Sequence, residues 1–178
     1  MVNDNILKDL GLVDGTPSLT PRQVEEIGTL LPEKETVRVL EFGAGRSTKL
    51  IFDALKKKYK EVVYVTYETN PKYVPTEEGI TVRMHTREDL VNSQITIPSH
   101  EKYDLVIIDG PDGDLRKHWF FLFKDNVQKS TIIHIDDAFH YPSFELEFRN
   151  NFPNTEDMFI VPLGSYKGNK CWITSKIL

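Results

Sequence analysis

Short apolar runs alternate with amphipathic stretches along most of this chain, and this alternation constrains the fold more than any other feature. Five runs have the length and the apolar, β-branched character of buried strands: 37–42, 61–67, 80–84, 103–108 and 131–135. Helical patterns lie between or after them, at 47–58, 114–126 and 143–150. Runs that are apolar on both faces suit a sheet that helices cover on both sides. The alternation therefore predicts a doubly wound, mostly parallel α/β sheet.

Both ends of the chain add to this sheet. Residues 157–161 and 170–174 have the pattern of two further strands with a turn-like connection, which predicts a C-terminal antiparallel hairpin and seven strands in all. Before the first strand, Thr20-Pro-Arg-Gln23 carries an N-cap, a proline at the first helical position and a capping-box glutamine. We expect one domain over 1–178, with an N-terminal helical cap at 1–36 and the α/β core at 37–178.

Composition excludes several classes of protein. The 178 residues suit one domain, and 27 acidic against 22 basic residues give a net charge of −5, which is unsuited to general nucleic-acid binding. No apolar run reaches the roughly 18–20 residues that span a bilayer, and the charged start does not resemble a signal peptide. The single cysteine, Cys171, cannot form an internal disulfide. We therefore expect a cytoplasmic protein without nucleic-acid or membrane partners.

A glycine-rich segment, Glu41-Phe-Gly-Ala-Gly-Arg-Ser-Thr48, follows the first predicted strand and opens a helix. Glycine lets the backbone turn sharply and lets a ligand approach closely, and a helix N-terminus favours negative charge or hydrogen-bond acceptors. Glu68 ends the second predicted strand, where dinucleotide-binding folds place an acid that binds ribose hydroxyls. The order of strand, loop, helix, strand and acid favours a cofactor site over a structural tight turn, which is the alternative.

The pattern acid-x-Gly-x-Gly-x-Ser-Thr resembles motif I of class I S-adenosylmethionine-dependent methyltransferases, and the resemblance covers about residues 18–175. In that family the loop holds the methionine and adenosine portion of the cofactor, and the acid after the second strand holds its ribose. The resemblance implies a Rossmann-like methyltransferase fold. It implies the following cofactor-binding residues: Glu41, Gly43, Ala44, Gly45, Ser47, Thr48 and Glu68. It also places the adenine pocket at Thr86 and Arg87, where solvated loop residues are an equally good interpretation.

Three aspartates follow the fourth and fifth predicted strands. Asp109 comes after the fourth, and Asp136 and Asp137 come after the fifth, so all three are expected at the carboxyl edge of the sheet, where ligands bind. Carboxylates gathered there repel one another. Mg²⁺, which takes oxygen ligands, removes that conflict and eases deprotonation of a bound hydroxyl. We predict a divalent-cation site at these aspartates; a plain turn at Asp109 and a helix cap at Asp137 are the alternatives.

Two strings, 108–114 and 135–139, resemble macrocin-type sugar O-methyltransferases, which place Asp after strand four and Asp-Asp after strand five. The arrangement also resembles the related catechol O-methyltransferases. This resemblance implies that Asp109 lies near the methyl-transfer position and the cofactor. Residues 16–23 resemble the start of a helix near the cofactor in these enzymes. The catechol group has a general-base lysine three positions after its first aspartate; Asp112 stands there, so that role does not carry over.

His140 follows Asp136 by four residues on the same predicted loop. It has the chemistry of a general base or an extra metal ligand, and a solvent-facing histidine is an equally good interpretation. We name Asp109 and His140 as the candidate catalytic residues.

Together these features predict methyl transfer from S-adenosylmethionine to a hydroxyl oxygen of a small-molecule or glycan acceptor, assisted by a divalent cation. One alternative is a nicotinamide-dependent oxidoreductase, against which Thr48 argues because the dinucleotide fingerprint has glycine there. The other is a non-catalytic cofactor-binding module of the same fold. Only 36 residues precede the first predicted strand, which suits an open site, a large acceptor or a homo-oligomer whose partner subunit covers the site.

Overall fold

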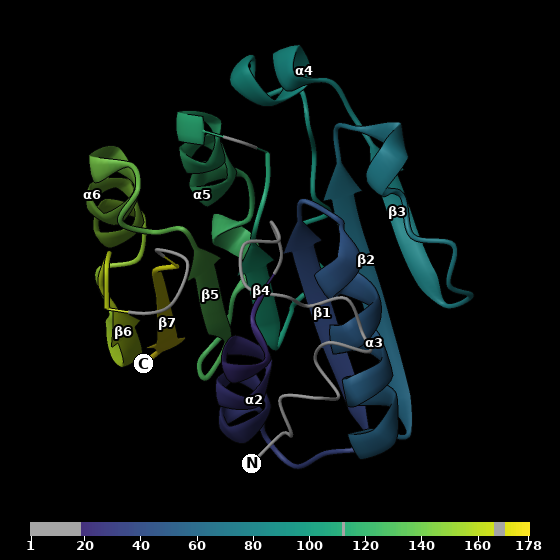
Figure 1. Ribbon diagram of the computed structural model, residues 1–178. Helices are drawn as coiled ribbons and strands as arrows, with labels where there is room; N and C mark the ends of the chain where they lie inside the picture. Colours follow the sequence, from purple (N-terminus) through teal and green to yellow (C-terminus); the bar gives the residue numbers. More distant parts are fainter. Residues whose placement is uncertain (1–18, 112, 166–169) are drawn as a thin grey trace.

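The computed structural model describes residues 19–111, 113–165 and 170–178. These residues form a seven-stranded sheet with the strand order β3-β2-β1-β4-β5-β7-β6 (Figure 1). The strands are β1 Thr36–Phe42, β2 Glu61–Glu68, β3 Ile80–Met84, β4 Leu105–Ile108, β5 Ile132–Asp136, β6 Thr155–Val161 and β7 Trp172–Ile177. Strands β1 to β5 pair in parallel, and β7 is antiparallel to both β5 and β6. The predicted α/β sheet with an antiparallel C-terminal end is confirmed.

Helices cover both faces of this sheet. They are α2 Pro21–Leu30, α3 Arg46–Lys58, α4 Arg87–Val91, α5 Trp119–Leu122 and α6 Pro142–Asn151, with 3₁₀ turns η1 Pro71–Tyr73, η2 Gly113–His118 and η3 Lys124–Asn126. Helices α2 and α3 pack on one face, and their residues Ile27 and Ile51 share an apolar cluster with Val39 of β1. The other helices pack on the opposite face, where Trp119 and Phe148 share a cluster with β1, β4 and β5. None of the described helices combines the length and apolar character needed to cross a membrane.

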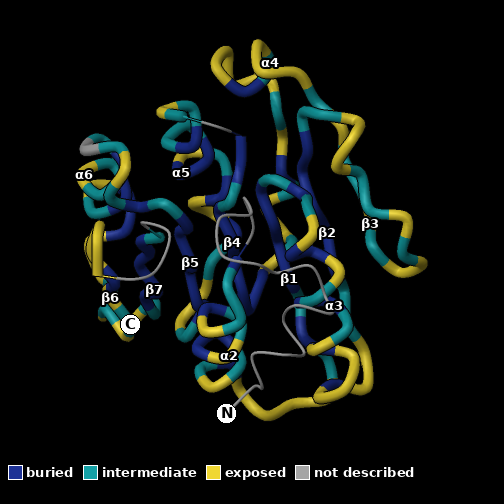
Figure 2. The backbone as a smooth tube through the Cα atoms, in the orientation of Figure 1, coloured by how far each residue is buried: buried dark blue, intermediate teal, exposed yellow. Residues whose placement is uncertain are grey.

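The central strands are buried on both faces, as the apolar runs predict (Figure 2). In β1, Val39 belongs to the cluster under α2 and α3, whereas Leu40 and Phe42 belong to the cluster under α5 and α6. Phe42 stacks on Trp119 at 4.2 Å between ring centroids. This alternation places residue 41 on the side of the sheet that α3 covers. The stacking of Phe42 on Trp119 brings the end of β1 against α5, so both helices lie at the carboxyl edge of the sheet.

The single helix predicted over 114–126 is wrong. The chain there forms η2, the one-turn α5 and η3, and Phe121 within it is 63% exposed. Arg116 and Trp119 both donate to the loop after β4, to the carbonyls of Pro111 and Gly110 respectively. A 3₁₀ turn brings residues three apart onto one side, so these two hydrogen bonds favour it over a continuous α-helix.

Other element boundaries shift by one to three residues. Asp136 is the last residue of β5 and does not follow that strand, and β4 begins at Leu105. Helix α2 has its predicted capping box, in which Thr20 Oγ1 accepts from the N–H of Gln23 and Gln23 Oε1 accepts from that of Thr20. The predicted N-terminal cap is described from Leu19 onward; the part of it before that residue, and residues 16–18 of the segment likened to a helix start, lie outside the described residues.

Candidate functional site

The glycine loop lies between the ends of β2 and β4. Gly43 has a φ of +94°, and its N–H donates to the carbonyl of Tyr67 at 2.8 Å. A Cβ on Gly43 would lie 2.3 Å from the backbone N of Gly110, the second residue after β4. Only glycine satisfies both the positive φ and this contact. The first glycine of the motif is therefore required by the fold itself.

Gly45 has a different role. Its φ of −174° is extended backbone that any residue adopts, and a Cβ there would meet nothing within 4 Å. Its N–H donates to Thr48 Oγ1 at 2.8 Å, which closes the first turn of α3. The protein's own packing therefore does not demand a glycine here. The space beside the Gly45 backbone is open, as expected where a ligand approaches the backbone.

Glu41 lies beneath the loop and is fully buried. Its Oε2 accepts from Thr48 Oγ1 at 2.9 Å, while Oε1 has no hydrogen-bond partner among the described residues. Burial raises the pKa of Glu41 to about 7, against the lowering effect of the Thr66, Thr48 and Tyr64 hydroxyls nearby. Glu41 therefore supports the loop through Thr48, and its predicted contact with a cofactor stays a prediction.

Two smaller residues complete the loop. Ala44 and Ser47 are both buried, and Ser47 is at the start of α3. Its hydroxyl donates to Asp109 Oδ2 at 3.4 Å. The glycine loop and the end of β4, predicted separately, therefore meet at one edge of the sheet.

Glu68 ends β2 as predicted and is 5% exposed. Its Oε1 accepts from the N–H groups of Thr69 and Asn70 at 2.7 and 2.6 Å. Among the described residues, Oε2 accepts no hydrogen bond. The carboxylate is thus fixed by its own turn through one oxygen, and the other oxygen remains for an external donor.

Thr86 and Arg87 begin α4, a helix that the sequence did not predict. Thr86 caps it, since its Oγ1 accepts from the N–H of Asp89 at 3.0 Å and Asp89 accepts from the N–H of Thr86 at 2.7 Å. Arg87 is exposed. The capping role accounts for Thr86 without a ligand, so an adenine pocket at these residues stays a prediction.

The three predicted aspartates do come together, because β4 and β5 are parallel neighbours. Asp109 lies against Asp136, and burial together with that neighbour raises the pKa of Asp109 well above its ordinary value. Asp137 has a φ of +55° and is half-buried, and burial and Asp136 raise its pKa as well. The carboxylates therefore crowd one another as the sequence suggested.

Two cations of the chain lie among these carboxylates. Lys170 Nζ is 3.0 Å from Asp136 Oδ2 and 4.0 Å from Asp137 Oδ1. Arg116 Nη1 is 3.4 Å from Asp137 Oδ2 and also donates to the carbonyl of Asp136 at 2.9 Å. Burial lowers the pKa of Lys170, but the negative charges of Asp136 and Asp137 raise it by more. The pKa of Lys170 is therefore above its ordinary value, and the ammonium stays charged.

Asp136 is the carboxylate that this arrangement stabilises. Its Oδ1 accepts from Gln23 Nε2 at 2.6 Å, so both of its oxygens have donors. Burial raises its pKa, but the charge of Lys170 and the hydrogen bonds from Lys170 and Gln23 lower it by more, so the pKa is below its ordinary value. His134 is buried between Gln23 and Thr174, and burial lowers its pKa to about 4, so it is neutral. Asp136 therefore carries its charge at neutral pH.

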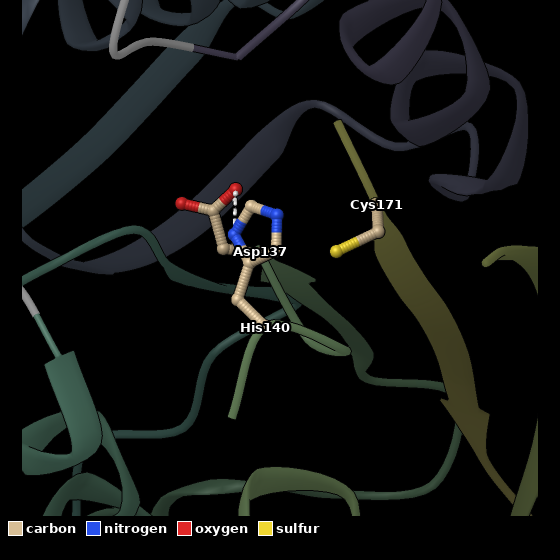
Figure 3. A group of neighbouring side chains, drawn as sticks. All are labelled: Asp137, His140 and Cys171. Carbon is tan, nitrogen blue, oxygen red and sulfur yellow. Dashed lines mark ion pairs between the residues drawn. The ribbon is translucent and has the colours of Figure 1, made fainter. Parts of the chain in front are cut away.

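His140 lies beside Asp137, with Nδ1 3.3 Å from Asp137 Oδ1, and its residue is exposed. Figure 3 shows the imidazole between the Asp137 carboxylate and the thiol of Cys171. One possible ligand atom from each of these three side chains lies within 4.8 Å of the other two. Lys170 is close enough to Asp137 to disfavour a cation here. A catalytic role for His140 stays a prediction.

Sequence reasoning missed three members of this cluster: Gln23, Arg116 and Lys170. The sequence pattern predicted only a helix-capping role for Gln23, which lies 113 residues from Asp136 in the chain. No sequence pattern predicted a site role for Lys170, because a lysine at the start of a predicted strand is common. The predicted antiparallel hairpin is the one feature that could have placed it, since it returns residue 170 to the end of β5.

No protein-family model matches the sequence, and no curated protein is significantly similar to it. Solved structures do match. A Staphylococcus aureus protein provisionally assigned as a caffeoyl-CoA O-methyltransferase matches with a TM-score of 0.63 and 13% identity over 99% of this chain and 93% of that chain.

Two further structures have the same architecture. A TehB-like SAM-dependent methyltransferase from Corynebacterium glutamicum matches with a TM-score of 0.61 and 12% identity over 98% of this chain and 95% of that one. The N-methyltransferase NodS from Bradyrhizobium japonicum, solved with S-adenosyl-L-homocysteine, matches with a TM-score of 0.57 and 11% identity over 87% of this chain and 84% of that one. At such identities the matches show the shared fold, so the chain has the Rossmann-like methyltransferase fold.

Proposed function

We propose that this protein transfers a methyl group from S-adenosylmethionine to a hydroxyl oxygen of a small-molecule or glycan acceptor. The observation that carries the proposal is the open backbone at Gly45, at the same sheet edge as the buried Glu68 carboxylate. Neighbours of this fold include methyltransferases of both oxygen and nitrogen acceptors. The neighbours described as SAM-dependent or solved with S-adenosyl-L-homocysteine support S-adenosylmethionine as the cofactor. The variety of acceptors among the neighbours leaves the acceptor to be argued from the site.

The cofactor fits the residues present. Glu68 Oε2 accepts no hydrogen bond among the described residues, so it suits a ribose hydroxyl. The N-terminus of α3 and the backbone beside Gly45 suit the hydrogen-bond acceptors of the methionine and adenosine portion. When bound, S-adenosylmethionine would supply an electrophilic methyl group on its sulfonium, and the demethylated cofactor would leave as S-adenosylhomocysteine. The chain's part is to align the acceptor oxygen with that methyl group.

Asp109 is the residue we assign to the acceptor proton. Its carboxylate accepts a hydrogen bond from the Ser47 hydroxyl, and the residue lies partly exposed at the edge of the sheet. Because burial and Asp136 raise its pKa, its carboxylate is a stronger base than an ordinary aspartate. His140 is the second candidate base, on an exposed loop next to Asp137. The predicted divalent cation does not enter this proposal, because Lys170 and Arg116 are paired with the aspartates that would hold one.

Calorimetric titration with S-adenosylhomocysteine tests the proposal directly. We expect binding to the wild-type protein and a loss of at least about tenfold in affinity for Glu68→Gln. A parallel titration with NADH addresses the oxidoreductase alternative, and we expect no binding. If the protein binds S-adenosylhomocysteine but methylates no hydroxyl acceptor in a library of phenols, sugars and glycans, the non-catalytic module becomes the better description.

A further inference from the structure

Side chains of the protein itself balance two of the three carboxylate charges at the ends of β4 and β5. Asp109, Asp136 and Asp137 carry three formal negative charges, and Lys170 and Arg116 bring two positive ones. Two positive charges are also what a divalent cation would bring. The electrostatic conflict from which a metal ion was predicted is therefore already relieved without one.

The hydrogen bonds at Asp136 do not suit a metal ligand. One oxygen accepts from Gln23 and the other from Lys170, and the side chain is fully buried. A cation bound to Asp136 would have to replace one of these donors, and Gln23 is itself held by the cap of α2. Because a buried carboxylate with both oxygens satisfied gains little from a new ligand, the arrangement does not fit the predicted divalent cation.

The second cation, Arg116, cannot easily give way either. It is 4% exposed, and its guanidinium donates to the backbone carbonyls of Pro111 and Asp136 as well as to Asp137. Lys170 is different. Among the described residues, its ammonium pairs with side-chain carboxylates alone, and its side chain is 14% exposed. Lys170 is therefore the less firmly held of the two cations, and it is the one that a divalent ion would have to displace.

We propose that the Lys170 ammonium takes the place of the divalent cation between these aspartates, so that the site carries its own fixed cation. Lys170 comes from the segment just before β7, and the antiparallel pairing of β7 with β5 brings it to the end of β5, where Asp136 and Asp137 lie. As a positioning residue, it orients Asp136 and Asp137 and favours negative charge on a nearby acceptor oxygen. This last consequence rests on the proposed function; the cation arrangement does not.

Binding of Mn²⁺, followed by the electron paramagnetic resonance of the free ion, tests the proposal without any need for activity. The wild-type protein is compared with Lys170→Gln, which removes the charge, and with Lys170→Arg, which keeps it. Lys176→Gln, on β7 and outside the site, is the matched control. We expect Lys170→Gln to bind Mn²⁺ at least about tenfold more tightly than the wild type, because a divalent ion no longer meets a fixed positive charge. Lys170→Arg and Lys176→Gln should match the wild type.

Two results would overturn the proposal. One is Mn²⁺ binding to the wild type that Asp136→Asn abolishes, because it would show that a divalent ion enters despite Lys170. The other is a folded Lys170→Gln protein with wild-type affinity for Mn²⁺. If Lys170→Gln does not fold, the comparison of the wild type with Asp136→Asn still decides the matter.

The same samples separate this proposal from the proposed function. S-adenosylhomocysteine binding is measured on the wild type and on each folded variant without metal. A wild type that binds neither S-adenosylhomocysteine nor Mn²⁺ contradicts the function and leaves the fixed cation standing. A wild type that binds S-adenosylhomocysteine and takes up Mn²⁺ through Asp136 supports the proposed function and contradicts the fixed cation. Methyl transfer that is unchanged by a chelator in the wild type would add support to both.

Discussion

Gly43 and Gly110 face each other so closely that neither can carry a side chain. A Cβ on Gly43 would lie 2.3 Å from the N of Gly110, and a Cβ on Gly110 would lie 2.6 Å from the Cα of Gly43. The N–H of Gly110 donates to the carbonyl of Phe42, so backbone atoms join the loops after β1 and β4 at this point. This contact brings the glycine loop against Asp109, and it separates the roles of the two glycines in the motif.

Gly43→Ala and Gly45→Ala should therefore fail in different ways. Gly43→Ala adds a backbone clash and strain at a positive φ, so we expect it to lower the free energy of unfolding by about 3 kcal/mol or more. Gly45→Ala should melt within a few degrees of the wild type, because its backbone is extended and its Cβ meets nothing. It should nevertheless lose at least about tenfold in S-adenosylhomocysteine affinity, since the methyl group would occupy the space in which the cofactor approaches the backbone. Thermal melts and calorimetry measure the two effects, and unchanged affinity in Gly45→Ala would show that the cofactor does not bind against Gly45.

Glu68→Gln tests the carboxylate at the end of β2. The amide oxygen can still accept from the N–H groups of Thr69 and Asn70, so the turn should survive. Loss of the charged acceptor should weaken S-adenosylhomocysteine binding by about 10- to 100-fold, the usual effect of one hydrogen bond to a charged group. Glu61→Gln, at the opposite end of the same strand, is the matched control and should bind as the wild type does. Equal affinities for the two variants would contradict a ribose-binding role.

The parts of this site that sequence predicts well are those that depend on local pattern and on parallel topology. The segment from Glu41 to Thr48 follows a buried strand and opens a helix, and both features are readable within a dozen residues. Asp109 and Asp136 come together because adjacent parallel strands end at the same edge. The number and order of the elements therefore suffice to place these groups.

The partners of those groups could not be predicted in the same way. Gln23 and Lys170 reach Asp136 from 113 and 34 residues away, and the choice between a metal ion and a lysine depends on distances of a few ångströms. The apolar residues 119–123 illustrate the same limit. Their composition favours a helix, but hydrogen bonds from Arg116 and Trp119 to one loop shorten it into turns. Tertiary contacts of this kind leave no periodic signal in the sequence.

Glu41 should make stability depend on pH in the direction opposite to that of an ordinary carboxylate. Burial raises its pKa from 4.5 to about 7 in the folded protein, so the folded state binds more protons than the unfolded state between those values. The free energy of unfolding should then fall by about 3 kcal/mol as the pH rises from 4.5 to 7, and level off above 7. Glu41→Gln carries no titrating proton and should remove this part of the slope.

Urea unfolding of both proteins between pH 4.5 and 8 measures the effect as a difference, which removes the contribution of the other carboxylates. We expect the two curves to diverge as the pH rises toward 7, with the variant the more stable at high pH. A wild-type protein whose stability rises over this range relative to Glu41→Gln would mean that the Glu41 carboxylate is charged and satisfied in the folded state.

Arg116 should matter to stability far more than its neighbour on the same turn. Its guanidinium joins the loop after β4 to the end of β5 by donating to the carbonyls of Pro111 and Asp136. Arg116→Met would leave both carbonyls and the Asp137 carboxylate without this donor, and we expect it to lower the free energy of unfolding by about 2–4 kcal/mol. Arg116→Lys keeps the charge but cannot span both carbonyls, so its effect should be intermediate.

Lys117→Met is the matched control for this prediction, because Lys117 pairs with Asp114 at the surface and such pairs contribute about 0–1 kcal/mol. Chemical denaturation of the three variants gives the ranking. If Arg116→Met were no less stable than Lys117→Met, the two loops would be held together by other contacts, foremost Gly43 against Gly110 and Trp119 on the Gly110 carbonyl. Combining Arg116→Met with Trp119→Phe would then show a loss larger than the sum of the single losses, because each donor would be compensating for the other.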